Sequence, residues 1–261
     1  MIIVTGSNGF IGKNLINRLE SKDILQVDKD EAWSLLEHNY NWEGIEKIYH
    51  IGAISSTTET DIDYIHHWNI NYSIRLFKKA IEHKIPVVYA SSASVYGNSN
   101  GESINPLNYY ALSKATVDYW VLDNMRSFEN IVGLRFFNVY GEGEENKGSQ
   151  ASPIHKFIKE SKENGKIEVF HGSSYYERDF VWVGNVIDCM LTKKDSGIYD
   201  VGTSKAISFM EVANIISEKY GSTIKVVPFP NNLNGKYQMK TCAKKDFDID
   251  FISVKDYVNL V

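Results

Sequence analysis

The chain has 261 residues, of which 43% are hydrophobic and 23% are charged, so it is long enough for one large α/β domain with a small appended lobe. Its formal net charge of −5 at pH 7 argues against nonspecific binding to nucleic acid or to a membrane surface. An anionic ligand would therefore be held by local donors rather than by an overall positive field.

Cysteine spacing and hydropathy indicate in which cellular compartment the protein is expected. Cys189 and Cys242 lie far apart and in no metal-ligand or redox spacing, so we expect a reducing cytoplasm and no metal site. No apolar run in the sequence approaches the ~20 residues of a membrane span. The chain begins within a predicted strand, so we expect no signal peptide.

The first twelve residues combine a buried strand with a glycine-rich turn. Ile2–Val4 is β-branched, and Gly6, Gly9 and Gly12 follow with the spacing Gly-x-x-Gly-x-x-Gly before a helical pattern over 10–19. Glycine permits a sharp turn, close approach of the backbone to a pyrophosphate, and tight packing of helix on strand. The helix N-terminus would direct its N–H groups at the phosphates. We predict a dinucleotide site here; the alternative is a glycine-rich turn without a ligand.

Strand and helix patterns then alternate. We expect strands at 24–27, 47–51, 86–91 and 131–136, and helices at 61–83 and 108–127. This alternation predicts a doubly wound, parallel α/β sheet of the Rossmann type, trimmed between residues 28 and 46. Beyond about residue 140 the elements become short. We therefore expect a dinucleotide-binding domain over 1–140 and a smaller α/β substrate lobe over 141–261, partly interwoven with it.

A tyrosine and a lysine share one face of the predicted helix 108–127. Tyr110 and Lys114 are four residues apart, so their side chains can meet over one site, whereas Tyr109 points away. A nearby ammonium favours the phenolate and should lower the tyrosine pKa from its reference value of about 10. The alternative is a surface Tyr–Lys pair.

Two serines end the predicted strand 86–91, at the edge where such sheets bind ligands. Ser91 and Ser92 could both cap the turn that follows. We expect Ser92 to hydrogen-bond the substrate oxygen that Tyr110 deprotonates.

These motifs together resemble a known family. Gly6-x-x-Gly9-x-x-Gly12, Ala90-Ser-Ser-Ala-Ser-Val-Tyr-Gly97 and Tyr110-x-x-x-Lys114 are similar to the motifs of extended short-chain dehydrogenases/reductases, the NDP-sugar epimerases and dehydratases. More specific strings resemble the ADP-L-glycero-D-manno-heptose 6-epimerases within that family. They are Gly52–Glu59, Arg135–Gly141, Lys147–Ser152, Arg178–Val183, Pro228–Pro230 and Gly235–Gln238.

The resemblance implies epimerisation by transient oxidation. Bound NADP would take a hydride from C6 of the heptose and return it to the opposite face of the carbonyl. The residues that match Tyr110 and Lys147 would serve as acid/base groups, one for each face. Without the resemblance, Lys147 would be a solvated loop lysine among Glu142, Glu144 and Glu145, and its use as a base needs local desolvation.

The resemblance also implies two sets of binding residues. The cofactor set comprises the glycine turn, Tyr110 and Lys114, together with the residues Phe10, Ile11, Asp28, Lys29, Gly52, Ala53, Ile54, Ser55, Asn69 and Val139. The sugar-nucleotide set adds to Ser92 the residues Asn138, Ser149, Lys156, Phe170, His171, Gly172, Ser173, Arg178 and Tyr237.

Three of these assignments have alternatives. The planar fork of Arg178 suits a diphosphate, but the side chain could instead pair with Asp179. Tyr237 could be a packing aromatic. Lys156 stands where the family more often has His, so its contact with the sugar nucleotide is open.

The chain is also shorter than is common in this family, with losses between Asp28 and Lys47 and near the C-terminus. Asp28 alone would favour the ribose hydroxyls of NAD, whereas Lys29 could accommodate a phosphate. We therefore expect NADP, with NAD as the alternative, in a homo-oligomer that binds a nucleotide sugar. Other possible functions are an NDP-sugar 4-epimerase and a non-catalytic dinucleotide-binding protein. Dehydration is disfavoured because no carboxylate follows Ser92 over Ala93–Val95.

Overall fold

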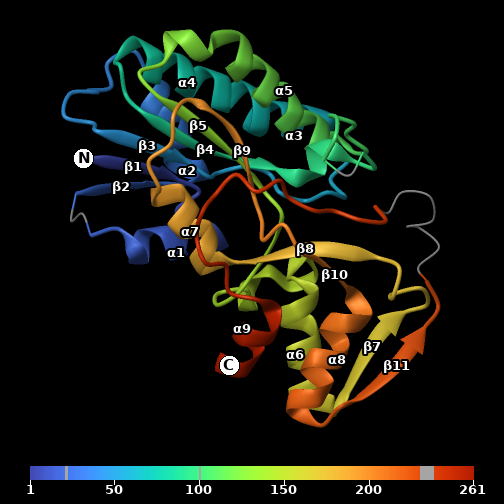
Figure 1. Ribbon diagram of the computed structural model, residues 1–261. Coiled ribbons are helices and arrows are strands. Elements are labelled where there is room, and N and C mark those ends of the chain that lie inside the picture. The colour runs from blue at the N-terminus through green and yellow to red at the C-terminus, as the bar shows by residue number, and fades with distance from the viewer. Residues whose placement is uncertain (21–22, 100, 230–237) are drawn as a thin grey trace. The chain divides into compact units, whose positions relative to one another are not determined.

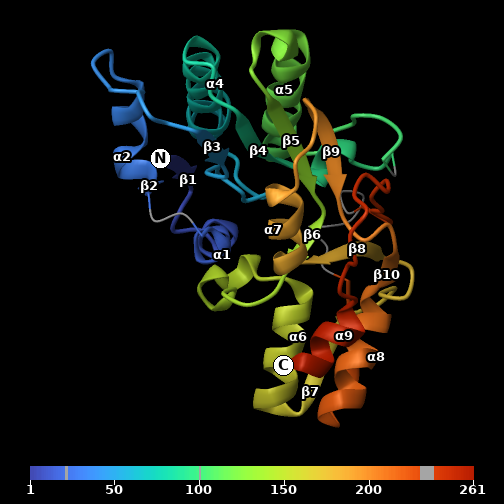
Figure 2. The ribbon, with the colours of Figure 1, turned by 60° about the vertical axis from the view of Figure 1, so that its left-hand side comes forward.

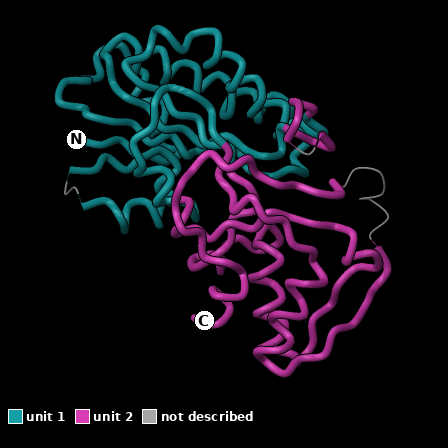
Figure 3. The backbone as a smooth tube through the Cα atoms, in the orientation of Figure 1, with its two compact units in different colours: residues 1–95, 106–135, 187–199 teal, residues 96–105, 136–186, 200–261 magenta. Residues whose placement is uncertain are grey.

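The computed structural model describes residues 1–20, 23–99, 101–229 and 238–261. Contacts within the chain group it into two compact units (Figure 3). Unit 1 comprises residues 1–95, 106–135 and 187–199, and unit 2 comprises residues 96–105, 136–186 and 200–261. The predicted domains, residues 1–140 and 141–261, are each one continuous stretch, whereas each unit consists of three segments of the chain. The domain division stays a prediction.

The central sheet is formed by the predicted apolar strands. Its strands are β1 (Ile2–Thr5), β2 (Ile24–Val27), β3 (Lys47–His50), β4 (Val87–Ser92), β5 (Ile131–Phe136) and β9 (Gly197–Val201), in the order β2-β1-β3-β4-β5-β9. The pairs β1–β2, β1–β3 and β3–β4 are parallel. The carboxyl ends of these four strands therefore lie at one edge, which is where ligands of open α/β sheets bind.

Helices cover both faces of this sheet, which confirms the doubly wound Rossmann-type fold. Figures 1 and 2 show α1 (Phe10–Arg18) on one face and α4 (Ser73–Glu82) and α5 (Tyr109–Asn124) on the other. The buried residues of α4 follow helical spacing, at Ser73, Leu76, Phe77 and Ala80, so one stripe faces the sheet. They join a core that includes Ile3, Ile48 and Val87, whose burial stabilises the unit by roughly 1.5–3 kcal/mol per large side chain.

The predicted helix over 61–83 is interrupted by a wide turn. The structure has α3 (Ile62–Ile65), a π-helical segment η2 (His66–Tyr72) and then α4. The stretch after β2 contains only the short helices α2 (Lys29–Ala32) and η1 (Trp33–Leu36) before β3, as expected for a trimmed region.

Unit 2 has two small sheets and a separate core. The strands β6 (Asn138–Tyr140), β8 (Glu177–Trp182) and β10 (Ala206–Ser208) pair in the order β10-β8-β6, while β7 (Lys166–Phe170) pairs in parallel with β11 (Thr223–Val227). Its core includes Tyr140, Ile154, Phe180 and Ile216. The helices are α6 (Pro153–Asn164), α8 (Phe209–Tyr220) and α9 (Val254–Leu260). In α7 (Val183–Leu191), residues 183–186 are grouped with unit 2 and residues 187–191 with unit 1.

Side-chain caps fix where these helices begin. Ser152, Ser208 and Ser253 each accept a hydrogen bond from the third residue of the helix that follows. Gly165 and Gly221 end α6 and α8 in the left-handed conformation. Within the described ranges, every helix is too short or too polar to cross a membrane.

Candidate active site

The turn between β1 and α1 has room for backbone only. The Gly6 N–H donates to the Val27 carbonyl at 2.8 Å, and the Gly9 N–H donates to the Gly6 carbonyl at 3.1 Å. A Cβ on Gly12 would lie 2.1 Å from the Gly6 oxygen, and one on Gly6, whose φ is 70°, would lie 2.6 Å from the Gly52 Cα. Gly9 is the N-cap of α1 and has no side chain to cover its first turn. These residues fit a dinucleotide pyrophosphate.

Asp28 follows β2 at the same sheet edge and is attached to this turn. Its Oδ2 accepts hydrogen bonds from the Asn8 N–H at 2.7 Å and from the Ser7 hydroxyl at 3.2 Å. Lys29, the next residue, donates to the Tyr64 hydroxyl at the start of the interrupted helix. The two residues assigned to the adenosine end of the cofactor therefore face different partners.

Tyr110, Lys114 and Ser92 lie together at the carboxyl end of β4. Lys114 is 8% exposed, and its Nζ donates to the Ala90 carbonyl at 2.8 Å. The Ser92 hydroxyl hydrogen-bonds the Tyr110 phenol and accepts from the Ser94 hydroxyl at 2.8 Å. Ser91 is buried, and its hydroxyl donates to the Asp118 carboxylate of α5 at 3.0 Å. The structure thus places Ser92, not Ser91, beside the tyrosine.

Burial sets the pKa values of the tyrosine and the lysine. Desolvation lowers the pKa of Lys114 to about 8, and the charge of Asp118 opposes that shift. Desolvation raises the pKa of Tyr110 above its ordinary value, although the hydrogen bond from Ser92 lowers it. The sequence-based expectation of a lowered tyrosine pKa was wrong in direction. Desolvation destabilises the buried phenolate by more than the hydrogen bond from Ser92 stabilises it.

Asp118 is a buried carboxylate next to these groups that sequence reasoning missed. It is 2% exposed and accepts hydrogen bonds from the Tyr89 hydroxyl at 2.9 Å, the Ser91 hydroxyl at 3.0 Å and Arg135 Nε at 2.9 Å. It lies one turn beyond Lys114 on α5. The signal was present in the sequence, because Asp118 continues the four-residue spacing of Tyr110 and Lys114.

Asn69, expected to contact the cofactor, is 1% exposed within the π-helical segment and bonds to protein groups instead. Its Oδ1 accepts from the Ile54 N–H at 2.7 Å, and its Nδ2 donates to the Ile54 carbonyl at 3.0 Å and the Ser113 hydroxyl at 2.9 Å. Ser113 in turn donates to the Tyr110 carbonyl at 2.7 Å. Asn69 therefore positions the loop Gly52–Ser55 against α5.

A buried histidine, also missed from the sequence, extends this polar chain to β1. His50 Nδ1 lies 2.7 Å from the Thr5 hydroxyl and Nε2 lies 2.8 Å from the Ser73 hydroxyl, which donates to the Asn69 carbonyl at 2.6 Å. Desolvation and the charge of Lys114 lower the pKa of His50 to about 3, so the imidazole is neutral at pH 7.

In unit 2, Lys147 lies on a loop that is organised by a buried glutamate. Glu144 is 0% exposed and accepts from the Gly141 N–H at 3.1 Å, the Ser152 N–H at 2.6 Å and the Ser152 hydroxyl at 2.7 Å. Lys147 Nζ donates to the same carboxylate at 3.1 Å. The two ends of the loop are thus tied to one carboxylate, which also holds the lysine. Sequence spacing did not show which of the three nearby glutamates would do this.

The remaining residues of the sugar-nucleotide set also lie in unit 2. Lys156 donates to the Ser149 carbonyl at 2.6 Å. Arg178 is 5% exposed, donates to the carbonyls of Glu177 and Gln238 at 2.7 and 2.8 Å, and lies over the Phe209 ring. The hydrogen bonds to the carboxylate of Asp179 come from Thr203, Ser204 and Ala243. Asn138 lies on β6, next to Val139 of the cofactor set. Phe170, His171, Gly172 and Ser173 lie at the end of β7, and Tyr237 lies outside the described residues.

Comparison with known proteins finds relatives whose similarity extends over nearly the whole chain. A family model, the NAD dependent epimerase/dehydratase family, matches residues 2–202. An ADP-L-glycero-D-manno-heptose-6-epimerase of Alkalilimnicola ehrlichii is 36% identical over 285 aligned positions, which cover 93% of this chain and 88% of that protein.

Two solved structures illustrate the likeness of fold. The Helicobacter pylori ADP-L-glycero-D-manno-heptose-6-epimerase aligns with a TM-score of 0.83 at 24% identity, covering 99% of this chain and 93% of the other. The Thermotoga maritima UDP-glucose 4-epimerase, solved with UDP-glucose, aligns with a TM-score of 0.84 at 19% identity, covering 99% and 96%.

The matched region contains the glycine turn, Ser92 and the Tyr110–Lys114 pair, and the resemblance to the extended short-chain dehydrogenases/reductases is confirmed. This family consists of enzymes that use a nicotinamide dinucleotide. The chain belongs to the NAD dependent epimerase/dehydratase family.

Proposed function

We propose that the chain is a cytoplasmic epimerase of a nucleotide-activated sugar, and that it inverts C6 of ADP-glycero-manno-heptose. The observation that carries the proposal is the grouping of Ser92, Tyr110 and Lys114 at the sheet edge that also bears the dinucleotide turn. The choice of sugar is supported by the 36% identity to a heptose epimerase.

A bound nicotinamide dinucleotide would accept a hydride from carbon and return it; NADP is the form that the resemblance implies. The chain's own residues would manage the proton. The phenolate of Tyr110 would take the proton of the substrate hydroxyl. Ser92, which hydrogen-bonds the Tyr110 phenol, would also hydrogen-bond that substrate oxygen. The ammonium of Lys114 would stabilise the phenolate and bind a ribose hydroxyl.

Inversion requires a second proton-transfer group, because the two epimers present their hydroxyls on different sides of the carbonyl plane. Lys147 is proposed for this role. Its Nζ donates to the Glu144 carboxylate at 3.1 Å, and its side chain is 27% exposed, so the ammonium is positioned by Glu144 while part of the side chain is open to solvent. It would donate a proton to the carbonyl oxygen as the hydride returns.

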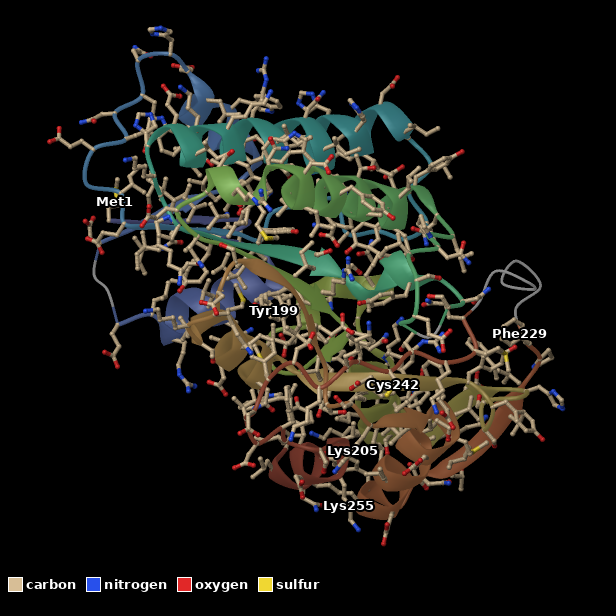
Figure 4. The ribbon with its side chains drawn as sticks, turned by 45° about the horizontal axis from the view of Figure 1, so that its top comes forward. Met1, Tyr199, Lys205, Phe229, Cys242 and Lys255 are labelled. Atoms are coloured by element: carbon tan, nitrogen blue, oxygen red, sulfur yellow. The ribbon has the colours of Figure 1, made fainter. Side chains whose placement is uncertain are left out.

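Aromatic side chains at the end of β7 suit a nucleotide base. Phe170 is 40% exposed and lies 5.9 Å from the Phe229 ring, which stacks on Tyr176 at 5.3 Å (Figure 4 labels Phe229). A planar base can stack on such rings. Arg178, from β8, remains the proposed diphosphate ligand and would have to exchange carbonyl partners for phosphate oxygens.

A homo-oligomer completes the proposal. Leu112, Tyr119 and Leu122 are 50%, 55% and 50% exposed along the outer side of α5, a larger apolar surface than isolated exposed side chains give. A second copy of the chain would cover it.

The test is incubation of the protein with ADP-D-glycero-D-manno-heptose, with the configuration at C6 followed by NMR. We expect interconversion of the two epimers, and a loss of about 10²–10⁴ in rate for Tyr110→Phe and for Lys147→Met. Dinucleotide binding should persist in both variants. No interconversion by protein that carries a dinucleotide would reject the assignment, and faster turnover of a UDP-hexose would indicate a 4-epimerase instead.

A further inference from the structure

The loop between β6 and α6 is organised around the buried carboxylate of Glu144, which is 0% exposed. Its Oε1 accepts hydrogen bonds from the Gly141 N–H at 3.1 Å and the Ser152 hydroxyl at 2.7 Å. Its Oε2 accepts from the Ser152 N–H at 2.6 Å and from Lys147 Nζ at 3.1 Å. The donors on Gly141 and Ser152 are neutral, and a buried carboxylate is costly unless a cation pairs with it. The Lys147 ammonium supplies that cation.

The backbone on both sides of the lysine is fixed as well. The Lys147 N–H donates to the Glu144 carbonyl at 2.9 Å. Gly148 follows with a φ of 52°, which lies in the left-handed region that favours glycine, so the chain turns directly after the lysine. The Ser149 carbonyl then accepts from Lys156 Nζ at 2.6 Å. Lys147 is therefore held through its side chain and through the residues beside it.

Other acidic and phenolic groups around this loop are placed differently. Glu142 accepts from Trp182 Nε1 at 2.9 Å, and Glu145 is exposed. On α9, burial raises the pKa of Tyr257, and the charges of Glu142 and Glu144 raise it further, so its phenol is neutral at pH 7. Glu144 is thus the buried carboxylate of this loop that contacts the lysine.

We propose that Glu144 is a positioning residue for catalysis: it holds Lys147 as an ammonium, so that Lys147 enters the reaction as the proton donor. In that step an N–H bond of Lys147 breaks and an O–H bond forms on the substrate oxygen, while the carbonyl carbon receives its hydride from the bound dinucleotide. The neutral amine regains its proton from water, since 27% of the side chain is exposed. The inference rests on the proposed epimerase function, but not on the identity of the sugar.

The first experiment measures the reactivity of the lysine without any sugar nucleotide. Acetic anhydride at trace concentration acetylates neutral amines, so an ammonium paired with a carboxylate reacts slowly. Mass spectrometry of peptides compares Lys147 with Lys159, whose side chain is 62% exposed. We expect Glu144→Gln to raise the ratio of Lys147 to Lys159 acetylation by about threefold, the size of effect that ion pairs near a surface give. An unchanged ratio in folded Glu144→Gln would overturn the proposal, whatever the substrate is.

The second experiment measures turnover of ADP-D-glycero-D-manno-heptose. A misplaced proton donor slows the chemical step more than it weakens binding, so Glu144→Gln should lower kcat by about 10²-fold and change KM much less. Glu144→Asp keeps the charge one methylene group further from the lysine, and should lie between wild type and Glu144→Gln in both experiments. It also carries the test if Glu144→Gln does not fold. A kcat equal to that of wild type in both variants would overturn the proposal.

Ser152→Ala is the matched control. It removes the hydroxyl that donates to Glu144 and caps α6, so it loosens the same loop, but the carboxylate and its contact with Lys147 remain. Its acetylation ratio and kcat should stay close to those of wild type, with thermal unfolding as the check on folding. A fall in kcat as large as that of Glu144→Gln would mean that loosening alone is responsible, and would overturn the proposal. A raised acetylation ratio in Glu144→Gln together with no heptose turnover by wild type would support the pairing and reject the sugar instead.

Discussion

At Tyr110, burial and hydrogen bonding act on the phenol in opposite directions. The hydrogen bond from Ser92 favours ionisation, whereas desolvation and the charge of Asp118 oppose it, and the pKa is raised. Lys114 shows the converse, since desolvation lowers its pKa to about 8 while Asp118 raises it. Asp118 thus shifts the pKa values of both side chains that are proposed to be catalytic, through its charge alone.

Replacement of Asp118 by Asn should therefore change the pH dependence of catalysis. Without the negative charge, the pKa of Lys114 falls below about 8, so the ammonium is lost at a lower pH. We expect the alkaline limb of the kcat–pH profile to move to lower pH. We also expect the free energy of unfolding to fall by about 3–5 kcal/mol, because the substitution removes the carboxylate that pairs with Arg135. Asp118→Glu, which keeps the negative charge, should show a smaller shift of the alkaline limb and a smaller loss of stability than Asp118→Asn.

Tyr89→Phe is the matched comparison, because it removes one donor at 2.9 Å and leaves the carboxylate charged. It should reduce stability by about 0.5–1.5 kcal/mol without moving the alkaline limb. An unchanged pH profile in Asp118→Asn, measured on folded protein, would contradict a positioning role for Asp118.

His50 is expected to make stability depend on pH. Its pKa in the folded protein is about 3, below the value of about 6.5 for an unfolded chain. Its contribution is therefore complete above pH 6.5 and is lost as the pH falls toward 3, by up to about 1.4 kcal/mol per pH unit. Urea unfolding of wild type and His50→Gln between pH 7.5 and 5 should show a shallower decline in the variant, whereas the exposed His38→Gln should follow wild type.

Among the elements, the loop between β6 and α6 depends on a single buried carboxylate. Glu144 binds both ends of the loop and Lys147. In Glu144→Gln the amide would turn a donor toward the Ser152 N–H or the Lys147 ammonium. We expect a loss of about 1–3 kcal/mol in stability and faster proteolysis of residues 141–152. Glu145→Gln, an exposed neighbour, should behave as wild type in both assays.

The strands and helices could be predicted from the sequence more readily than the contacts between their side chains. The β-branched strands and the glycine turn appear as expected because local pattern and burial agree there. The place of Asn69 could not be found in the same way, since a π-helical segment breaks the 3.6-residue period from which faces are inferred. The direction of the Tyr110 pKa shift was also beyond reach, because it depends on how deeply α5 packs on β4.

On the scale of the whole molecule, the exposed side of α5 leads to a prediction about assembly. Light scattering coupled to size-exclusion chromatography should give a mass that is a multiple of 29.7 kDa. Tyr119→Glu together with Leu122→Glu should reduce that mass toward one chain while the far-UV circular dichroism stays the same. A wild-type mass of 29.7 kDa at micromolar concentration would reject the oligomer.

The π-helical segment η2 bears on how the chain tolerates deletions. A π turn holds one residue more than an α turn, so removal of Ile70 or Asn71, which follow Asn69, would leave a regular helix. Residues before the cut would rotate by about 100° relative to α4. Asn69 would then leave the Ile54 backbone, although the buried stripe of α4 kept its register on the sheet. A homologue shortened in this way would keep its fold and lose the anchoring of the loop that corresponds to Gly52–Ser55.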